Sequence, residues 1–370
     1  MSKYELTVDM NYVSDWGLPQ AIRELFQNAY DAQRENSENK AFCNYYPDKE
    51  TIEIGNKSSV LNIETLLLGA TSKANDENTV GQFGEGYKLA TLVLLRAKKE
   101  VTFYNYGCRE VWHTKLVKSR RYNGHCVPVF DVDKKFIWQS VPHNNLVVEI
   151  KGITAEEYET IKKFILPLNE DIGNSLDCMY LGKILLDKKY GGDVYCSGLY
   201  ICHNDELQYG YDISPKYLTL ERDRQTVTSF NLTWVTSRMW SFHTNTEQFN
   251  KLLFSDDNYD LSYIYSHLTA NNELMQALEN NYGDVIPVLT QEEYDTIKKL
   301  GGNPRIVSAP VRRLYDSIYT NYIATNGKAK ESCYNRLSNW FDKVLEEYDI
   351  NQELSDEFYN ILESYEEVLK

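Results

Sequence analysis

The sequence predicts an α+β protein in three parts. Its 370 residues are too many for one ordinary hydrophobic core, and hydrophobic residues make up 42% of the chain, which is enough for packed domains. Helical and strand patterns alternate over residues 1–165. Strand patterns prevail over 166–230 and helical patterns over 231–370, so we expect domain boundaries near residues 165 and 230.

The first part opens with an amphipathic helix. Apolar residues within Leu18–Gln33 recur with the spacing of one helical face. Residues 70–79 are polar and show no periodicity, so we expect a mobile loop there. The other elements expected up to residue 165 are a turn at Gly55–Ser59, helices at Asn62–Leu68, Tyr87–Ala97 and Ala155–Ile165, and strands at Thr51–Ile54, Glu100–Tyr106, Glu110–Val117, Val127–Asp131, Phe136–Ser140 and Leu146–Ile150.

The second and third parts differ in their local patterns. Short apolar runs predict strands at Lys183–Leu186, Asp193–Cys202 and Leu207–Tyr211, and the charged stretch Glu221–Arg224 follows them. The remainder is helical in pattern, apart from a strand-like piece at Asp284–Leu289. Thr290 and Glu293 form a capping-box pattern, which opens a helix that we expect to stop at Gly301.

Composition limits the classes of function. The formal net charge of −15 disfavours a general nucleic-acid surface, because neutralising phosphates needs concentrated Lys and Arg. Seven cysteines without a C-x-x-C pair predict reduced thiols, and the scattered histidines predict no structural zinc. The most apolar stretch, Leu89–Leu95, is too short to cross a bilayer. We therefore expect a soluble, cytoplasmic protein.

Three pieces of the sequence carry candidate chemistry, and the first is a polar stripe on the N-terminal helix. Glu24, Asn28 and Asp31 stand at i, i+4 and i+7, so they share one helical face. The amide oxygen of Asn28 suits Mg²⁺, while Glu24 could orient and deprotonate a water molecule. Taken alone, such a stripe is also typical of the solvent face of an amphipathic helix.

The second piece is a glycine-rich turn that runs into a helix. Glycines let the backbone approach phosphate closely, and the free N–H groups at a helix N-terminus attract anions. The residues are Gly81, Gln82, Phe83, Gly84, Glu85, Gly86, Tyr87 and Lys88, of which the last adds a positive charge. They match neither the dinucleotide fingerprint nor the Walker loop. A turn of this kind alone is a weak indication of binding.

The third piece joins a strand end to a surface loop. Asn56 follows the strand at 51–54, and its side chain could pair with the edge of a base. Ser72 and Lys73, within Gly69–Lys73, could contact phosphate. Taken alone, these residues would be a capped turn and a surface loop.

In order and spacing, the three pieces resemble the GHKL (Bergerat-fold) ATPases. Glu24-Leu-Phe-Gln-Asn28-Ala-Tyr-Asp31-Ala is similar to the N box of that superfamily, and Val80 to Lys88 is similar to its second glycine box. The Gly69–Lys73 piece together with Lys88 is most similar to the MORC and heat-shock chaperone type. The resemblance is continuous over about residues 20–100, and Asn144–Ile150 is similar to the closing strand of the domain.

The resemblance implies a Bergerat-type α/β sandwich, in which helices cover one face of a mixed, largely antiparallel sheet. It implies that Glu24 is the general base, Asn28 the Mg²⁺ ligand and Asp31 a supporting polar residue on the pocket wall. It further implies that Gly81 to Gly86 and Lys88 hold the phosphates of ATP, and that residues 70–80 form a lid. ATP and Mg²⁺ are the cofactors that follow from it.

One box departs from the superfamily pattern. An Asp-x-Gly-x-Gly box normally supplies an Asp to the adenine amino group, but Gly55–Ser59 has neither that Asp nor the second glycine. We assign Asn56 as the substitute, because its amide oxygen can accept a hydrogen bond from the adenine amine. A neutral acceptor makes a weaker hydrogen bond than a carboxylate, so a weaker adenine contact is expected.

A basic residue from a following domain often reaches the γ-phosphate in this superfamily. Arg222 and Arg224 are the candidates here, because a guanidinium group can grip phosphate with two N–H donors. An Arg–Asp surface network is the alternative interpretation of the same stretch.

The function predicted is Mg²⁺-dependent ATP binding and slow hydrolysis that drives a conformational switch. The switch would act on an unidentified protein partner or client, and an ATP-dependent homodimer is one arrangement that the resemblance allows. The alternative is a non-hydrolysing ATP-sensing or inhibitory interaction module, of the kind a mobile element carries. No His precedes His113, which argues against a protein histidine kinase. The composition supports neither nucleic acid nor a membrane as the partner.

Overall fold

The computed structural model of the chain describes most of the N-terminal two thirds and parts of the rest. The described residues are 2–66, 86–134, 143–218, 229–255, 257–268, 276, 278, 280, 283, 285–326, 337, 338, 340, 341, 344 and 352–365. The chain divides into two compact units, Met1–Phe242 and His243–Lys370.

A seven-stranded sheet forms the base of the first unit. Its order is β1-β6-β5-β4-β7-β3-β2, and every neighbouring pair is antiparallel. The strands are β1 (Ser2–Glu5), β2 (Ala41–Tyr46), β3 (Thr51–Asn56), β4 (Glu100–Asn105), β5 (Glu110–Lys118), β6 (Cys126–Asp133) and β7 (Leu146–Lys151). Helices α1 (Leu18–Glu35), α2 (Gly86–Arg96) and α3 (Ala155–Phe164) accompany it. The predicted α+β class, a largely antiparallel sheet with helices, is confirmed.

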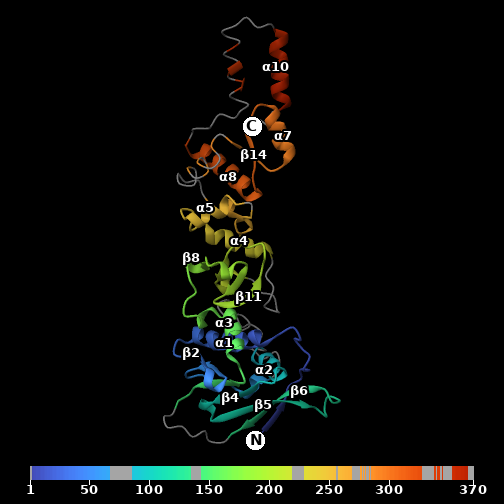
Figure 1. Ribbon diagram of the computed structural model, residues 1–370, viewed down its shortest axis with the longest axis vertical. Helices are drawn as coiled ribbons and strands as arrows, with labels where there is room; N and C mark the ends of the chain where they lie inside the picture. Colours follow the sequence, from blue (N-terminus) through green and yellow to red (C-terminus); the bar gives the residue numbers. More distant parts are fainter. Residues whose placement is uncertain are drawn as a thin grey trace. The chain divides into compact units, whose positions relative to one another are not determined.

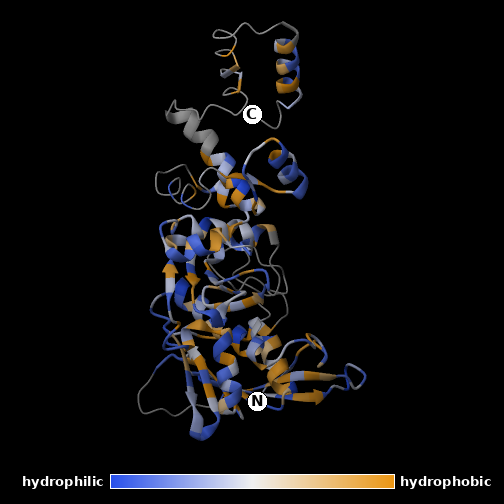
Figure 2. Cartoon of the chain, turned by 45° about the horizontal axis from the view of Figure 1, so that its top comes forward, coloured by the Kyte–Doolittle hydropathy of each residue, from blue (hydrophilic) through white to orange (hydrophobic). Residues whose placement is uncertain are grey.

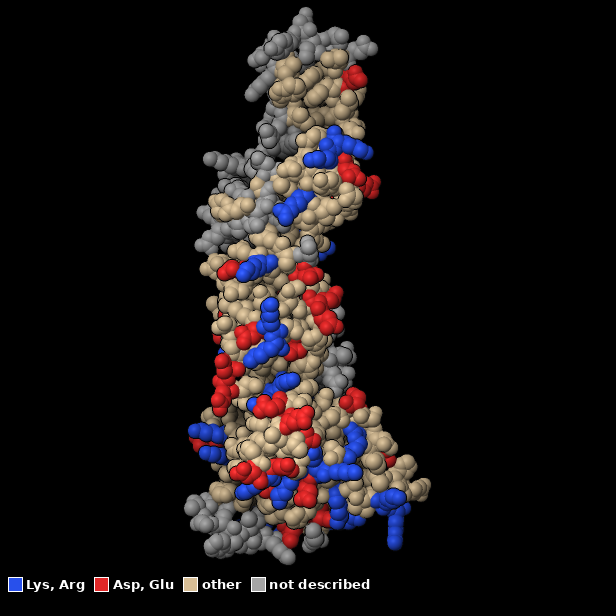
Figure 3. All heavy atoms as spheres, in the orientation of Figure 1, with Lys and Arg blue, Asp and Glu red and all other residues tan. Residues whose placement is uncertain are grey.

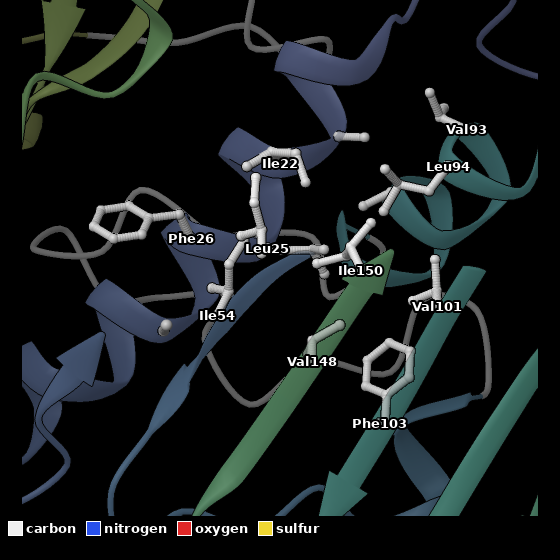
Figure 4. Close-up of a cluster of buried hydrophobic side chains, with 14 of the residues drawn as sticks. Ile22, Leu25, Phe26, Ile54, Val93, Leu94, Val101, Phe103, Val148 and Ile150 are labelled. Carbon is white, nitrogen blue, oxygen red and sulfur yellow. The ribbon is translucent and has the colours of Figure 1, made fainter. Parts of the chain in front are cut away.

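One hydrophobic core lies between this sheet and its helices. Alternate residues of the strands point to the same side, as the two-residue period of a strand requires. Figure 4 shows Ile54, Val101, Phe103, Val148 and Ile150 of the sheet meeting side chains of α1 and α2, namely Ile22, Leu25, Phe26, Val93 and Leu94. This packing fixes α1 and α2 side by side on one face of the sheet.

Helix α1 is enclosed on several sides. It begins after Gly17, whose backbone N–H donates to Gln20 Oε1 at 3.0 Å, and Pro19 stands in its first turn, where a missing N–H costs nothing. All residues of Ala21–Gln27 are buried, the polar ones included. Figure 1 shows the reason, because α1 and α3 lie between the first sheet and a second one.

The second sheet has five strands in the order β11-β10-β12-β9-β8. Strands β10 and β12 are parallel and the other neighbours antiparallel. The bounds are β8 (Ser175–Asp177), β9 (Gly182–Leu185), β10 (Asp193–Cys196), β11 (Leu199–His203) and β12 (Gly210–Ile213). Helix α4 (Ser229–Trp240) packs on it, with Trp240 Nε1 donating to the Tyr211 hydroxyl at 2.8 Å.

The second unit is mainly helical. Its elements are α5 (Glu247–Leu253), β13 (Ile286–Val288), α7 (Gln291–Lys299), β14 (Pro304–Ile306), α8 (Ala309–Asn326) and α10 (Gln352–Ser364), and β13 pairs with β14 in parallel. Thr290 caps α7 as predicted, since its hydroxyl accepts from Glu293 N while Glu293 Oε2 accepts from Thr290 N. Hydrophobic and hydrophilic positions mix along the helices (Figure 2), and within the described ranges no helix is long and apolar enough to span a bilayer.

Several element predictions need correction. The expected strand Asp193–Cys202 is a hairpin, because Ser197 and Gly198 both adopt positive φ and reverse the chain. Gly55 and Asn56 belong to β3 and not to a turn, and only a short 3₁₀ turn, Ile63–Leu66, is described within the expected helix at 62–68. The strand expected at 136–140 lies outside the described residues.

Candidate functional site

The polar stripe of α1 meets the first turn of α2. A Cβ atom added to Gly86 would lie 2.5 Å from Glu24 Oε2 and 3.6 Å from Asn28 Nδ2. A Cβ atom here would displace the Glu24 carboxylate, because real Cβ contacts are essentially never so short. The structure therefore brings together one residue of the glycine-rich turn and two of the helix stripe, which are far apart in sequence.

Glu24 is held by the residue next to it. Its Oε1 accepts from Arg23 Nη2 at 2.9 Å, and the two side chains are 1% and 2% exposed. The other end of the guanidinium, Nη1, donates to the backbone carbonyl of Tyr200 on β11 at 2.7 Å. A buried carboxylate needs a cationic partner of this kind. Arg23 was not identified from the sequence. The one feature that could have pointed to it is a charged residue within a helical stretch whose neighbours Ala21, Ile22 and Leu25 are apolar.

Asn28 is the most accessible member of the stripe. Its Nδ2 donates to the Glu24 carbonyl at 3.0 Å, one turn back along α1, so the amide oxygen points away from that bond. One amide oxygen fits the way proteins bind Mg²⁺, which keeps several waters and takes its remaining ligands from phosphates. No cluster of three or more His, Cys, Asp or Glu residues able to hold a metal is present among the described residues.

Asp31, in the C-terminal half of α1, is buried at 1% exposure. Burial, and then the charge of Asp212, raises the pKa of the Cys196 thiol on β10, and the charge of Asp31 acts in the same direction. This interaction locates Asp31 near Cys196. Its assignment to the wall of a nucleotide pocket stays a prediction.

Lys88 is directed toward the 3₁₀ turn at Ile63–Leu66. Its Nζ donates to the Thr65 carbonyl at 2.8 Å, and the side chain is 1% exposed. The Tyr87 hydroxyl lies 2.9 Å from Thr65 Oγ1, so both residues after Gly86 are tied to the same turn. An ammonium group has three donors, and the Thr65 carbonyl accepts from one of those of Lys88.

Asn56 joins the end of β3 to α1. Its Nδ2 donates to the Ala29 carbonyl at 2.7 Å and to the Asn39 carbonyl at 3.0 Å. Two carbonyl acceptors can be satisfied only by the NH₂ end, which fixes the orientation of the amide. Both donors are therefore used within the protein, and the oxygen is the atom left to accept a hydrogen bond from a ligand.

The remaining candidates cannot be placed. Ser72, Lys73, Gly81, Gln82, Phe83, Gly84, Glu85, Arg222 and Arg224 lie outside the described residues.

Comparisons with known proteins found similar solved structures. No protein-family model matches the chain, and no curated protein matches it either. The ATPase region of Saccharomyces cerevisiae topoisomerase II matches with 12% identity and a TM-score of 0.33, over 54% of this chain and 68% of that one. The same region bound to ICRF-187 (dexrazoxane) matches with 13% identity and a TM-score of 0.31, over 48% and 61%.

A third structure holds the ATPase and transducer domains of DNA topoisomerase II from Balamuthia mandrillaris. It matches with 16% identity and a TM-score of 0.25, over 37% of each chain. This chain thus spans less than two thirds of the second and third structures.

Proposed function

We propose that the protein binds ATP with Mg²⁺ and hydrolyses it slowly, and that this reaction drives a conformational switch acting on a partner macromolecule. The observation that carries the proposal is the contact of Gly86 with Glu24 and Asn28. It gathers a carboxylate, the amide side chain of Asn28 and the first turn of a helix at one place. A base, a metal ligand and free N–H donors are what phosphoryl transfer to water requires.

The proposal gives each candidate residue a role. Glu24 Oε2, which faces Gly86, would orient the attacking water and take its proton. Asn28 would hold Mg²⁺ through its amide oxygen, and the ion neutralises charge on the phosphates when bound. Asn56 would accept from the adenine amine. Lys88, the turn at 81–86, Ser72 and Lys73 would contact the phosphates.

The conformational switch would involve the lid and the second domain. By the resemblance to GHKL ATPases of the MORC and heat-shock chaperone type, residues 70–80 would close over the nucleotide, and Arg222 or Arg224 would bring the second domain to the γ-phosphate. The partner is proposed to be a protein. On the face shown in Figure 3, Lys and Arg are interspersed with Asp and Glu, which does not favour nucleic acid.

Phosphate release from ATP and Mg²⁺ tests the proposal, with nucleotide affinity measured beside it by calorimetry. We expect slow turnover by the wild type, ATP binding without turnover by Glu24→Gln, and loss of Mg²⁺-dependent binding by Asn28→Ala. Glu53→Gln is the matched control, since Glu53 is a carboxylate on β3 that accepts from the Tyr46 hydroxyl instead. It should behave as the wild type.

Two outcomes would count against the proposal. Binding without any phosphate release by the wild type would favour the ATP-sensing or inhibitory module. Absence of nucleotide binding would overturn both the ATPase and the ATP-sensing module. It would indicate that adenine binding is lost with the Asp of the adenine box.

A further inference from the structure

We infer that Arg23 is a positioning residue that couples the Glu24 carboxylate to the second sheet. The inference rests on the proposed function, in which Glu24 acts on water. In this inference, the position of β11 determines the orientation of the Glu24 carboxylate.

The guanidinium of Arg23 bridges two elements with its two ends. Nη2 holds Glu24 Oε1, while Nη1 holds the carbonyl of Tyr200. With Oε1 engaged, the other oxygen, Oε2, is the one directed at Gly86. Because a guanidinium is planar and rigid, moving one of its partners turns the other. Arg23 therefore sets which oxygen of Glu24 faces the first turn of α2.

The contact of α1 with the second sheet is built differently from its contact with the first. Toward the first sheet, α1 presents apolar side chains that pack in one core. Toward the second sheet, α1 presents polar side chains. Arg23 and Gln27 stand one helical turn apart, and Asp31 follows one turn later. Arg23 Nε and Gln27 Nε2 are buried, and neither makes a hydrogen bond to any residue that the structure describes. Buried donors without acceptors are costly, so this polar contact holds α1 less firmly than the apolar contact with the first sheet does.

The same interface contains open space. A pocket of about 440 Å³, open to solvent, lies between the C-terminal half of α1, the connection at 166–172 and the second sheet. Tyr30 and Arg34, on α1, line one side, and Lys183 and Asp212 line the other. No side chain of the described residues fills this pocket, so the sheet has room there to shift against α1.

The second sheet is anchored at one edge of this interface. Ile165 and Leu199 form an antiparallel bridge, and Leu166 N donates to the Gly198 carbonyl at 2.8 Å. Leu199 also belongs to the core of the first sheet. Rotation about this anchor would move the Tyr200 carbonyl, which follows it directly, and Arg23 with it. The sheet thereby turns Glu24 into or out of its working orientation.

The first arm of the test measures turnover. Arg23→Lys keeps a cation beside Glu24 but cannot bridge a carboxylate and a carbonyl with a planar fork. We expect kcat to fall between about tenfold and a hundredfold, since small misplacements of a reacting group have effects of this size, while the Kd for ATP stays within about threefold.

Arg96→Lys is the matched control for this arm. Arg96 donates to the backbone carbonyls of Met10, Tyr12, Val13 and Trp16 and makes no hydrogen bond to Glu24, so the exchange should lower stability and leave kcat near that of the wild type. If Arg23→Lys also keeps the wild-type kcat, the inference is overturned.

The second arm needs no nucleotide. Glu24→Gln in the full-length protein should speed hydrogen exchange at the amides of Leu199–His203 about tenfold, because residues within one network couple by energies of this order. The amides of Ser175–Asp177, on the far strand of the same sheet, should keep their rates. Unchanged exchange at β11 would refute the coupling, even where turnover confirms the ATPase. A wild type that binds no ATP would remove the proposed function and leave this arm to decide the coupling alone.

Discussion

At the scale of single residues, the amide group of Asn56 occupies the candidate adenine position. Asn56 stands where the GHKL resemblance calls for Asp, and the structure gives a local reason for the amide. Both of its N–H donors are taken by backbone carbonyls, those of Ala29 and Asn39. A carboxylate at this position would face two acceptors with no proton to offer.

Asn56→Asp should therefore destabilise the protein. We expect the free energy of unfolding to fall by about 3 kcal/mol, because two buried carbonyls lose their donors. Urea denaturation at neutral pH measures the change. Asn123→Asp, at an exposed turn residue, is the control and should be close to neutral. Equal stability of the two variants would show that the amide of Asn56 is oriented otherwise.

Gly86 is the second residue whose identity follows from one contact. A methyl group there would lie 2.5 Å from Glu24 Oε2, so Gly86→Ala should push the carboxylate aside. We expect ATP turnover to fall at least about tenfold and the stability to fall by ~1–3 kcal/mol from overpacking. Gly17→Ala, whose added carbon would approach Gln20 Oε1 only to 3.4 Å, should keep its turnover.

Asp212 provides a prediction on pH. Burial raises the pKa of this carboxyl above its ordinary value of 3.8, although Gly198 N–H, Lys183 and Arg34 act in the opposite direction. The folded state thus binds the proton more tightly than the unfolded state. The resulting stability is fully present below pH 3.8 and is lost as the pH rises through the folded pKa.

Asp212→Asn removes this titration and keeps an acceptor for Gly198 N–H, which lies 2.6 Å from Asp212 Oδ1. Urea denaturation of both proteins from pH 4 to pH 8 gives the difference between them. The wild type should lose stability relative to the variant as the pH rises. A constant difference across the range would contradict the raised pKa.

At the scale of elements, the local pattern predicted the elements that carry a clear period. Helices α1, α2 and α3 and strands β4 to β7 lie where the periodicity placed them, within a few residues at their ends. Strands β1, β2, β8 and β14 were missed, because β1, β8 and β14 are too short to show a period and β2 owes its pairing to β3. Secondary structure of this kind depends on tertiary partners.

The β10–β11 hairpin shows what a local rule could have found. Ser197 and Gly198 form a two-residue loop with φ of 52° and 80°, and Ser-Gly is a recognised turn pair. Ser197→Asn should raise the free energy of unfolding by about 0.5 kcal/mol, since Asn tolerates positive φ better.

Gly198→Ala should have the opposite effect on the hairpin. The added carbon would lie 2.8 Å from Pro167 Cδ in addition to straining the turn, so a loss of more than about 1 kcal/mol is expected. Thermal or urea unfolding of the Ser197→Asn and Gly198→Ala variants measures whether each raises or lowers the free energy of unfolding. A stabilising Gly198→Ala would show that the turn differs from the one described.

At the scale of the whole molecule, the chain divides into two compact units, of which the first ends at Phe242. The first unit contains the seven-stranded and the five-stranded sheet, helices α1 to α4 and every described candidate residue. Its two layers share hydrogen bonds and a bridge, so they should unfold together.

A fragment ending at Phe242 should fold by itself and bind ATP with the affinity of the full chain. Circular dichroism, urea denaturation and calorimetry measure this. One cooperative transition is expected from the fragment. Two separate transitions within it would show that the sheets are independent, and loss of ATP binding would assign part of the site to the second unit.

The sequence by itself determined the stripe of Glu24, Asn28 and Asp31 and the type of most elements of the first unit. Both depend on periods of a few residues, which the chain carries locally. The tertiary structure alone decided that Gly86 meets Glu24, that Asn56 holds α1, and that Arg23 binds a carbonyl 177 residues away. Burial and hydrogen-bond partners arise when distant segments pack together, and no local period encodes which segments those are.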